Sequence, residues 1–253
     1  MITRQQITQF ARQFKTNEAT VYREYLQLLF LNTLYNQPKS KDVFFKGGTA
    51  IHFIYGASRF SEDLDFTVNL RLENFQKMIG AIFSELISQF QLSFKEQKTI
   101  AGKRFVLNSQ NIKDFPPAYI HLDFSFREDV LEPQKTIITT QYPVLFTSYV
   151  YHLSSNEIFS EKVRAIMTRK KGRDLYDLWF LSTIGASIKN DLVQKKLDYY
   201  KMVLNHQELI ERIVSFPKKD FILDLKPFVA IPERQKLDAL YDYIQKYCQK
   251  YFS

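Results

Sequence analysis

The sequence is poor in cysteine and in glycine, and it contains no long apolar run. Its 253 residues include a single cysteine, Cys248, so a disulfide framework within the chain and a thiolate metal cage are excluded. No apolar stretch approaches the roughly 18–20 residues that a membrane-spanning helix requires. The segment MITRQQITQFARQF lacks the apolar core of a signal peptide. We therefore expect a cytoplasmic protein with no membrane partner.

The charged residues are unbalanced toward the positive sign. Lys and Arg number 35 against 27 Asp and Glu, which gives a formal net charge of +8 at pH 7. This excess favours an anionic partner, such as a nucleic acid or a nucleotide, and a merely solvated basic surface explains it equally well. The hydrophobic fraction of 45% is typical of a globular protein, and the length suits one large domain or two smaller ones.

The apolar periodicity changes character near residue 150. Before that point, helical spacing alternates with strand-like segments, and the strand-like segments cover 43–45, 64–70, 92–98, 103–107 and 119–126. Beyond it, the spacing predicts helices at 157–169, 174–184, 192–204, 206–215 and 234–251. The pattern predicts an α+β domain over residues 1–150, followed by a helical domain over residues 151–253 that packs against it.

Three regions of the first part are expected to be helical. Apolar spacing predicts helix over 4–36, interrupted near 15–17, and again over 48–55 and 75–90. The strand candidates 92–98 and 103–107 flank Ala101-Gly102, so they are expected to pair across a tight turn.

Three of the seven glycines lie in one segment, KGGTAIHFIYGASRFSEDLDF, at residues 46–66. Gly47 and Gly48 fall between a predicted strand and a predicted helix, where free backbone N–H groups can cradle a phosphate, and Thr49 adds a hydroxyl. The GxxxxGK[ST] pattern of a P-loop is absent. A tight strand-to-helix turn without a ligand accounts for the glycine pair equally well.

The same segment ends in two carboxylates. Asp63 and Asp65 are two residues apart, so in a strand they share one face while Leu64 and Phe66 share the other. Two carboxylates at such a short separation repel each other and need a cation between them. Mg²⁺ often binds one or two carboxylates together with substrate phosphates. A solvated strand end or a helix cap is the alternative interpretation.

The segment YIHLDFSF repeats this pattern with one aspartate, Asp123, on the face opposite Leu122 and Phe124. If this strand lies beside that of Asp63 and Asp65, three carboxylates converge and could hold two metal ions for a phosphoryl or nucleotidyl displacement. Asp123 could then accept the proton of the acceptor hydroxyl.

These features suggest one site for a nucleoside triphosphate. Its phosphates would contact the glycine turn and its magnesium ions the Asp63–Asp65 pair, with Lys46, Arg59 and Ser61 close to the nucleotide. In a later segment, Lys162, Arg169 and Arg173 fall at helical spacing, so their cations could line phosphates. A solvated basic helix face is the alternative.

The segment of residues 46–66 resembles the signature of the AbiEii/AbiGii-type nucleotidyltransferase toxins, which reads KGGTAL, a short helix and R-x-S-x-D-L-D-F. The segment SEKVRAIMTRKKGRDLYDLWF resembles their second signature, a Glu-Lys pair followed by Arg and an R-D-x-Y-D-L run. The order and separation of the two segments fit the family over most of the chain. Ile51 replaces the usual Leu, which is a conservative departure.

The resemblance implies a polymerase-β-like core, an α+β fold with a mixed sheet, and a C-terminal helical bundle that contributes to the active-site cleft. It implies magnesium-dependent transfer of a nucleoside monophosphate from a triphosphate, with release of pyrophosphate. Such proteins act as toxins in toxin–antitoxin or abortive-infection systems, and some relatives modify the acceptor end of tRNA. A cognate antitoxin and an RNA acceptor, most simply tRNA, are therefore expected partners.

The resemblance also assigns roles to residues. Asp63 and Asp65 match the metal-binding pair, and Asp123 fits the third carboxylate of the wider superfamily. Gly47, Gly48 and Thr49 match the phosphate-binding turn, Lys162 matches a lysine that contacts the nucleotide phosphates, and Asp174 and Asp177 match acidic residues needed for activity. From the residues alone, Asp174 could instead cap a helix, and Tyr176 and Trp179 are expected in the core between the domains.

Two alternatives keep part of this interpretation. One retains nucleotidyl transfer but replaces RNA by a protein or a small-molecule acceptor. The other retains the fold without turnover, as a nucleotide- or RNA-binding module.

Overall fold

The computed structural model describes residues 1–99, 102–109 and 115–252. By their internal contacts these residues form two compact units. The first comprises residues 1–56 and 60–153, and the second comprises residues 57–59 and 154–253. The short segment 57–59 thus belongs to the second unit, and the chain re-enters the first unit at Phe60.

The first unit is built on a seven-stranded mixed sheet. Its strands are β1 (Val43–Lys46), β2 (Leu64–Val68), β3 (Ser93–Gln97), β4 (Lys103–Asn108), β5 (Tyr119–Ser125), β6 (Pro133–Thr136) and β7 (Val150–Leu153). Their order across the sheet is β3-β4-β5-β2-β1-β7-β6. The β2–β5 and β1–β7 pairs are parallel, and the other pairs are antiparallel. The predicted α+β architecture with a mixed sheet is confirmed.

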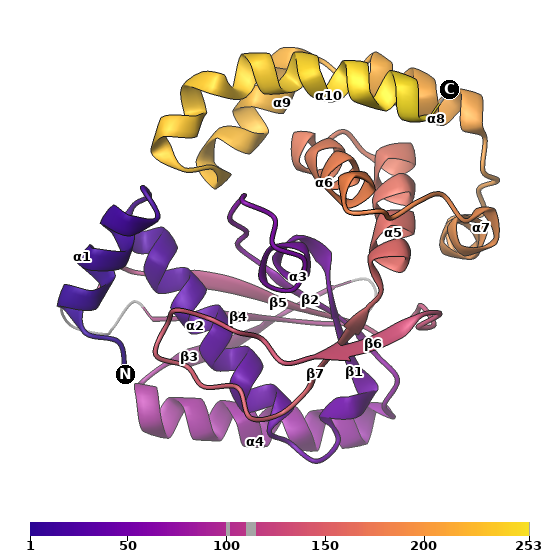
Figure 1. The fold of residues 1–253 in the computed structure, drawn as a ribbon. Coiled ribbons are helices and arrows are strands. Elements are labelled where there is room, and N and C mark those ends of the chain that lie inside the picture. The colour runs from indigo at the N-terminus through magenta and orange to yellow at the C-terminus, as the bar shows by residue number, and fades with distance from the viewer. Residues whose placement is uncertain (100–101, 110–114, 253) are drawn as a thin grey trace. The chain divides into compact units, whose positions relative to one another are not determined.

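Four helices accompany this sheet: α1 (Arg4–Gln13), α2 (Glu18–Tyr35), α3 (Gly47–Phe53) and α4 (Leu72–Phe90). In Figure 1, α4 lies below the sheet in the view and α3 lies above it. The predicted interruption near residues 15–17 is confirmed, because Asn17 caps α2 by accepting a hydrogen bond from the Thr20 backbone N–H at 2.7 Å. A one-turn 3₁₀ helix, η1 (Ser40–Asp42), leads into β1.

The core of the first unit is rich in phenylalanine. Phe66 of β2 and Phe124 of β5 stack with ring centroids 4.8 Å apart, and Phe75 of α4 lies 4.8 Å from Phe124. Along β5 the burial alternates strictly, so Ile120, Leu122 and Phe124 are buried while Asp123 is half-buried. The predicted alternation of this strand is therefore confirmed.

The second unit is helical. Its helices are α5 (Ser155–Thr168), α6 (Gly172–Thr183), α7 (Asn190–Asp198), α8 (His206–Val214), α9 (Lys218–Leu225), η2 (Lys226–Phe228), η3 (Ile231–Lys236) and α10 (Leu237–Phe252). Ser154 caps α5 through the Glu157 N–H at 3.0 Å. Gly172 permits α6 and α9 to approach closely, because a β-carbon there would lie 2.7 Å from the Phe221 Cα.

Several predicted boundaries are wrong. The helix expected over 192–204 ends at Asp198, and the one expected over 234–251 begins as the 3₁₀ helix η3. Strands β6 and β7 and helix α9 were not predicted. The paired strands β3 and β4 are confirmed, and Ala101 of their predicted turn lies outside the described residues. In the part of the chain that the structure describes, no helix is long and apolar enough to cross a membrane.

Candidate active site

The glycine turn lies where β1 ends and α3 begins. Gly47 adopts a φ of +76°, a conformation that residues with a β-carbon rarely adopt. A β-carbon at Gly47 would also overlap the Asp65 Oδ2 and lie only 2.9 Å from the Asp65 Cγ. The glycine therefore makes room for the Asp65 carboxylate, which gives a direct structural reason for glycine ahead of the carboxylates.

Thr49, in the first turn of α3, is fully buried, and its hydroxyl donates a short hydrogen bond to the backbone carbonyl of Asp63. On the other side of this segment, the Gln27 side chain of α2 donates to the carbonyls of Ser61 at 3.1 Å and Glu62 at 2.8 Å. The residues that lead to the carboxylates are thus fixed by two polar side chains. The Gln27 contact was not predicted, because the sequence does not show which helix faces this loop.

The register of the sheet brings the aspartates of two strands together. In the parallel β2–β5 pair, Asp65 is the direct partner of Asp123, and in the β1–β2 pair it is the partner of Lys46. Partners in register place their side chains on the same face. The strand of Asp123 therefore lies beside the strand of Asp65, as the prediction of three converging carboxylates required. Asp63 stands two residues before Asp65.

A guanidinium from the next strand faces these acids. Arg104 of β4 is the register partner of Asp123, and its Nε lies 2.6 Å from the Asp123 Oδ1. The hydrogen bond to Asp123 and the charges of Asp123, Asp63 and Asp65 together raise the pKa of Arg104 against the opposing effect of burial. The negative charges of all three carboxylates thus stabilise the charged form of the Arg104 guanidinium. Sequence analysis missed Arg104, since only the strand register pairs it with Asp123.

Lys46 has its own carboxylate partner. Its Nζ lies 3.3 Å from the Glu128 Oε2, and both residues are buried. A buried ion pair constrains both side chains, and removal of either one would leave an uncompensated charge. Glu128 was also missed, because it lies in a loop that carries no motif.

The donor set of the first unit fits an oxygen-preferring divalent cation. Asp63 and Asp65 supply the one or two carboxylates that Mg²⁺ commonly uses alongside substrate phosphates. Within residues 1–99, 102–109 and 115–252, no group of three His, Cys, Asp or Glu side chains is arranged to hold a metal ion. This agrees with the bond from Asp123 to Arg104, which engages one oxygen of the predicted third ligand.

The second unit holds a buried cluster of ion pairs. Arg59 makes a two-pronged contact with Asp177, from Nε to Oδ1 at 2.5 Å and from Nη2 to Oδ2 at 2.6 Å. The Lys162 Nζ lies 2.7 Å from the Asp177 Oδ2 and 2.8 Å from the Asp174 Oδ1. Arg169 completes the cluster with its Nε 2.7 Å from the Asp174 Oδ2. Five residues of the two signature segments thus meet in one network.

The charges of this cluster depend on one another, because most of its members are buried. Arg59 is 2% exposed and Asp177 is fully buried. Burial alone would raise the pKa of Asp174, but the charge of Lys162 and the contacts with Arg169 more than compensate and hold it well below its usual value. Burial likewise opposes the charged form of Arg59, and the charge and hydrogen bonds of Asp177 outweigh it, so the pKa of Arg59 is raised.

The predicted line of phosphate-binding cations is organised differently. Lys162 and Arg169 are bonded to Asp174, while the Arg173 Nε lies 3.3 Å from the Asp224 Oδ1 and its guanidinium stacks on Phe228 at 4.2 Å. Asp174 does not cap a helix, because α6 begins at Gly172 and its N-cap is Lys171. Three cations face two carboxylates in the cluster of Arg59, Lys162, Arg169, Asp174 and Asp177, so one positive charge is in excess.

The comparisons with known proteins agree with both signatures. The family model described as "Nucleotidyl transferase AbiEii toxin, Type IV TA system" matches residues 29–252. MenT4, a nucleotidyltransferase toxin from Mycobacterium tuberculosis H37Rv, has a similar structure, with a TM-score of 0.68, 18% identity, and coverage of 100% of this chain and 90% of its own. JHP933 from Helicobacter pylori is also similar, with a TM-score of 0.55, 21% identity, and coverage of 92% and 95%. No curated protein sequence matches the chain.

Proposed function

Because the chain belongs to the AbiEii family of nucleotidyltransferase toxins, we propose that it transfers a nucleoside monophosphate from a nucleoside triphosphate to an acceptor and releases pyrophosphate. The observation that carries this proposal is the position of Asp65, which packs against the Gly47 turn and is in register with Asp123. A turn able to approach a phosphate and a pair of carboxylates on the neighbouring strand are the two elements that such a transfer needs.

In this proposal Asp63 and Asp65 hold magnesium. When bound, the ion stabilises negative charge on the triphosphate and on the leaving pyrophosphate. The backbone N–H groups of Gly47 and Gly48 contact phosphate oxygens, while Thr49 acts through its hydrogen bond to Asp63. Lys46 adds positive charge beside the turn and is oriented by Glu128.

Asp123 fits an electrostatic role. Its Oδ1 accepts the Arg104 Nε–H at 2.6 Å, so a proton transferred from the acceptor to that oxygen would have to displace a charge-assisted hydrogen bond. Asp123 serves as the proton acceptor only if its other oxygen faces the acceptor hydroxyl. We therefore propose that Asp123 and Arg104 act as a pair that sets the charge next to Asp65.

Asp174 and Asp177 are positioning residues in this proposal. Both are saturated by cations of the second unit, and Asp177 holds Arg59, which precedes Asp63 by four residues in the chain. Fixing residues 57–59 restricts the start of the loop that carries Ser61 and ends at the metal-binding pair. An excess positive charge in the cluster is also consistent with the predicted contact between Lys162 and the nucleotide phosphates.

The acceptor in the proposal is RNA, most simply tRNA, and the protein acts in the cytoplasm as a toxin controlled by a cognate antitoxin. The family supports the toxin role, and the net charge of +8 supports an anionic acceptor. A protein or small-molecule acceptor is the rival within the same chemistry.

The experiment that tests the proposal compares two labels on the same nucleotide. Purified protein is incubated with magnesium, total cellular RNA, and each triphosphate labelled at either the α- or the γ-phosphate. We expect the α-label, and not the γ-label, to enter RNA. If the α-label entered protein and not RNA, a protein acceptor would be favoured. Incorporation of the γ-label into RNA would contradict nucleotidyl transfer.

A further inference from the structure

A cavity of about 430 Å³ lies within the second unit. All of its lining residues belong to that unit, including Ser58 of the segment 57–59. Its volume falls within the range of small-molecule sites in proteins, which is roughly 300–1,000 Å³. The metal-binding pair and the ion-pair cluster do not line it, so it is a separate feature of the molecule.

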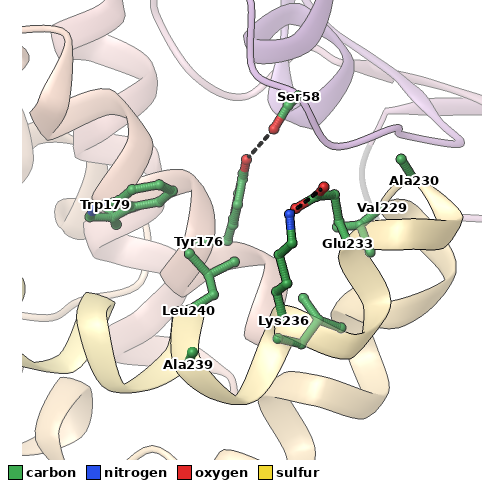
Figure 2. Close-up of a pocket in the computed structure, with 10 residues that line it drawn as sticks. Ser58, Tyr176, Trp179, Val229, Ala230, Glu233, Lys236, Ala239 and Leu240 are labelled. Carbon is green, nitrogen blue, oxygen red and sulfur yellow. Dashed lines mark hydrogen bonds and ion pairs between the residues drawn. The ribbon is translucent and has the colours of Figure 1, made fainter. Parts of the chain in front are cut away.

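One wall of the cavity is aromatic. Tyr176 and Trp179 project from α6, with ring centroids 5.3 Å apart and ring planes at 69° (Figure 2). The Tyr176 hydroxyl is bonded to the Ser58 hydroxyl at 3.0 Å, which fixes the orientation of the ring. Sequence analysis expected these rings in the core; Tyr176 is buried, but both rings also border open space.

The rest of the lining is aliphatic, apart from one ion pair. Val229, Leu237 and Leu240 contribute apolar surface. The Lys236 Nζ lies 3.0 Å from the Glu233 Oε1, and both side chains are more than half exposed. Figure 2 marks this ion pair with a dashed line. This pair offers a hydrogen-bond donor beside an acceptor, and solvent contact leaves both groups able to turn toward a ligand.

A flat ring with a polar edge matches this combination. Aromatic walls favour stacking on a planar ligand, and bases stack on such walls whatever their identity. A neighbouring donor and acceptor match the Watson–Crick edge of any nucleobase, since every base presents both a donor and an acceptor on that edge. An aliphatic ligand would use the apolar walls but not the ion pair.

We propose that this cavity binds the nucleobase of a nucleotide, with the base stacked on one of the two rings, Tyr176 or Trp179, and edge-on to the other. Its polar edge then faces Glu233 and Lys236. The proposal rests on the proposed function only in that a nucleotidyltransferase must handle nucleotides. Ser58 connects the two sites along the chain, because it lines the cavity and precedes Asp63 by five residues.

Trp179 provides a direct reporter, because it is the only tryptophan in the chain. Its fluorescence is followed while adenosine, cytidine, guanosine or uridine is titrated into the Asp65→Ala variant without magnesium, with correction for absorption by the base. We expect saturable quenching by nucleosides and none by ribose 5-phosphate or pyrophosphate, which lack a base. Because no transfer occurs under these conditions, the result is independent of the proposed reaction.

A filled cavity is the matched test. Ala239 lines the cavity on an exposed position of α10, so Ala239→Leu should fold normally while it occupies part of the space. We expect it to weaken nucleoside binding at least about tenfold, which corresponds to about 1.4 kcal/mol. Ala81→Leu, on an exposed position of α4, is the control and should bind as before.

Two results would overturn the proposal. One is the absence of saturable quenching by any nucleoside, and saturable quenching by benzene would then show a purely apolar site. The second is equal quenching in Ala239→Leu and Ala81→Leu, which would place the ligand elsewhere. The proposed function is tested independently of these results, by transfer of labelled nucleotide by the wild-type protein.

Discussion

At the scale of single residues, Gly47 is the most constrained position of the candidate active site. It combines a positive φ with a β-carbon position that the Asp65 carboxylate already fills. Either constraint alone would favour glycine, and together they exclude every other residue unless Asp65 moves. The role of this glycine is thus defined by the carboxylate as well as by the predicted phosphate.

Replacing Gly47 by alanine should therefore impair activity more than folding. We expect Gly47→Ala to lose about 1–2 kcal/mol of stability from the left-handed backbone and to reduce label transfer at least a hundredfold, because Asp65 is displaced. Gly80→Ala is the control. Gly80 lies in α4 with open space around it, and this change should add about 0.5–1 kcal/mol. Full activity of Gly47→Ala would contradict the packing of Asp65 on the turn.

The Arg59–Asp177 pair gives a second prediction for individual residues. Asp177→Asn leaves Arg59 and Lys162 without a full counter-charge in a buried site, which typically costs about 3–5 kcal/mol of unfolding free energy. The double variant Arg59→Gln/Asp177→Asn should cost less than the sum of the two single changes, because the residues act as one pair. Urea unfolding measures all three, with the exposed Asp191→Asn as control.

The same set of variants separates positioning from direct chemistry. If Asp177→Asn unfolds at the wild-type urea concentration yet loses label transfer, Asp177 takes part in the reaction itself and the positioning role is wrong. If stability and activity fall together, and the double variant shows coupling, the positioning role is supported.

The pH dependence of stability follows from Asp174. Its pKa in the folded protein is lowered from the usual 3.8, so the unfolded chain takes up a proton at a higher pH than the folded one. The contribution of Asp174 to stability is therefore complete above pH 3.8 and is lost as the pH falls below it toward the folded pKa. Unfolding of wild type and Asp174→Asn between pH 6 and pH 3, values that bracket that point, should show a constant difference that narrows only at the acidic end. A difference that narrows between pH 6 and pH 5 would point to another group.

At the scale of secondary structure, the neighbouring strands β4, β5 and β2 assemble the acidic site. Register alone pairs Arg104 with Asp123 and Asp123 with Asp65. The Arg104 guanidinium is bonded to the Asp123 carboxylate, so it would compete with any ion that Asp123 helped to bind.

Removing that guanidinium should strengthen metal binding. We expect Arg104→Ala to bind Mn²⁺ about tenfold more tightly than wild type without nucleotide, a change of about 1.4 kcal/mol. Electron paramagnetic resonance of free Mn²⁺ measures this without turnover. Lys103→Ala is the control, since its Nζ is bonded to Glu96 at 2.6 Å. Equal affinity in wild type and Arg104→Ala would show that Arg104 does not compete with the ion.

The elements that could be predicted from the sequence are those with a clear period. The alternation of YIHLDFSF predicted β5 and placed Asp123 on its polar face, where the structure has it half-buried. Strand β7 has no such alternation, because three of its four residues are buried, and β6 begins with a proline in a largely exposed segment. Ion-pair partners such as Arg104 and Glu128, and hydrogen-bond donors such as Gln27, depend on tertiary packing that no local pattern encodes.

At the scale of the whole molecule, the two signature segments divide their residues between the two units. Asp63 and Asp65 belong to the first unit, and Lys162, Asp174 and Asp177 belong to the second. Arg59 lies in one signature segment and is bonded to Asp177 of the other, and residues 57–59 are grouped with the second unit. The motif spacing led to a prediction of nucleotide binding, which stays a prediction, and it did not indicate this ion-pair connection.

The net charge of +8 makes a prediction about the acceptor. If RNA binds through phosphate contacts, the logarithm of its affinity should fall linearly with the logarithm of salt concentration. Filter binding of tRNA to the Asp65→Ala variant between 50 and 200 mM salt, a range over which six to ten phosphate contacts lose roughly 10³–10⁵ in affinity, measures this slope. A slope near zero would favour the protein or small-molecule acceptor.

The measurement that tests the central claim most directly is transfer of α-labelled nucleotide by wild type, Asp65→Asn and Asp191→Asn under identical conditions. The substitution at position 65 preserves shape and removes one charge, and Asp191 is an exposed aspartate of α7. We predict equal labelling by wild type and Asp191→Asn, and labelling reduced at least a thousandfold in Asp65→Asn with normal folding. Undiminished labelling by Asp65→Asn would contradict the assignment of the active site.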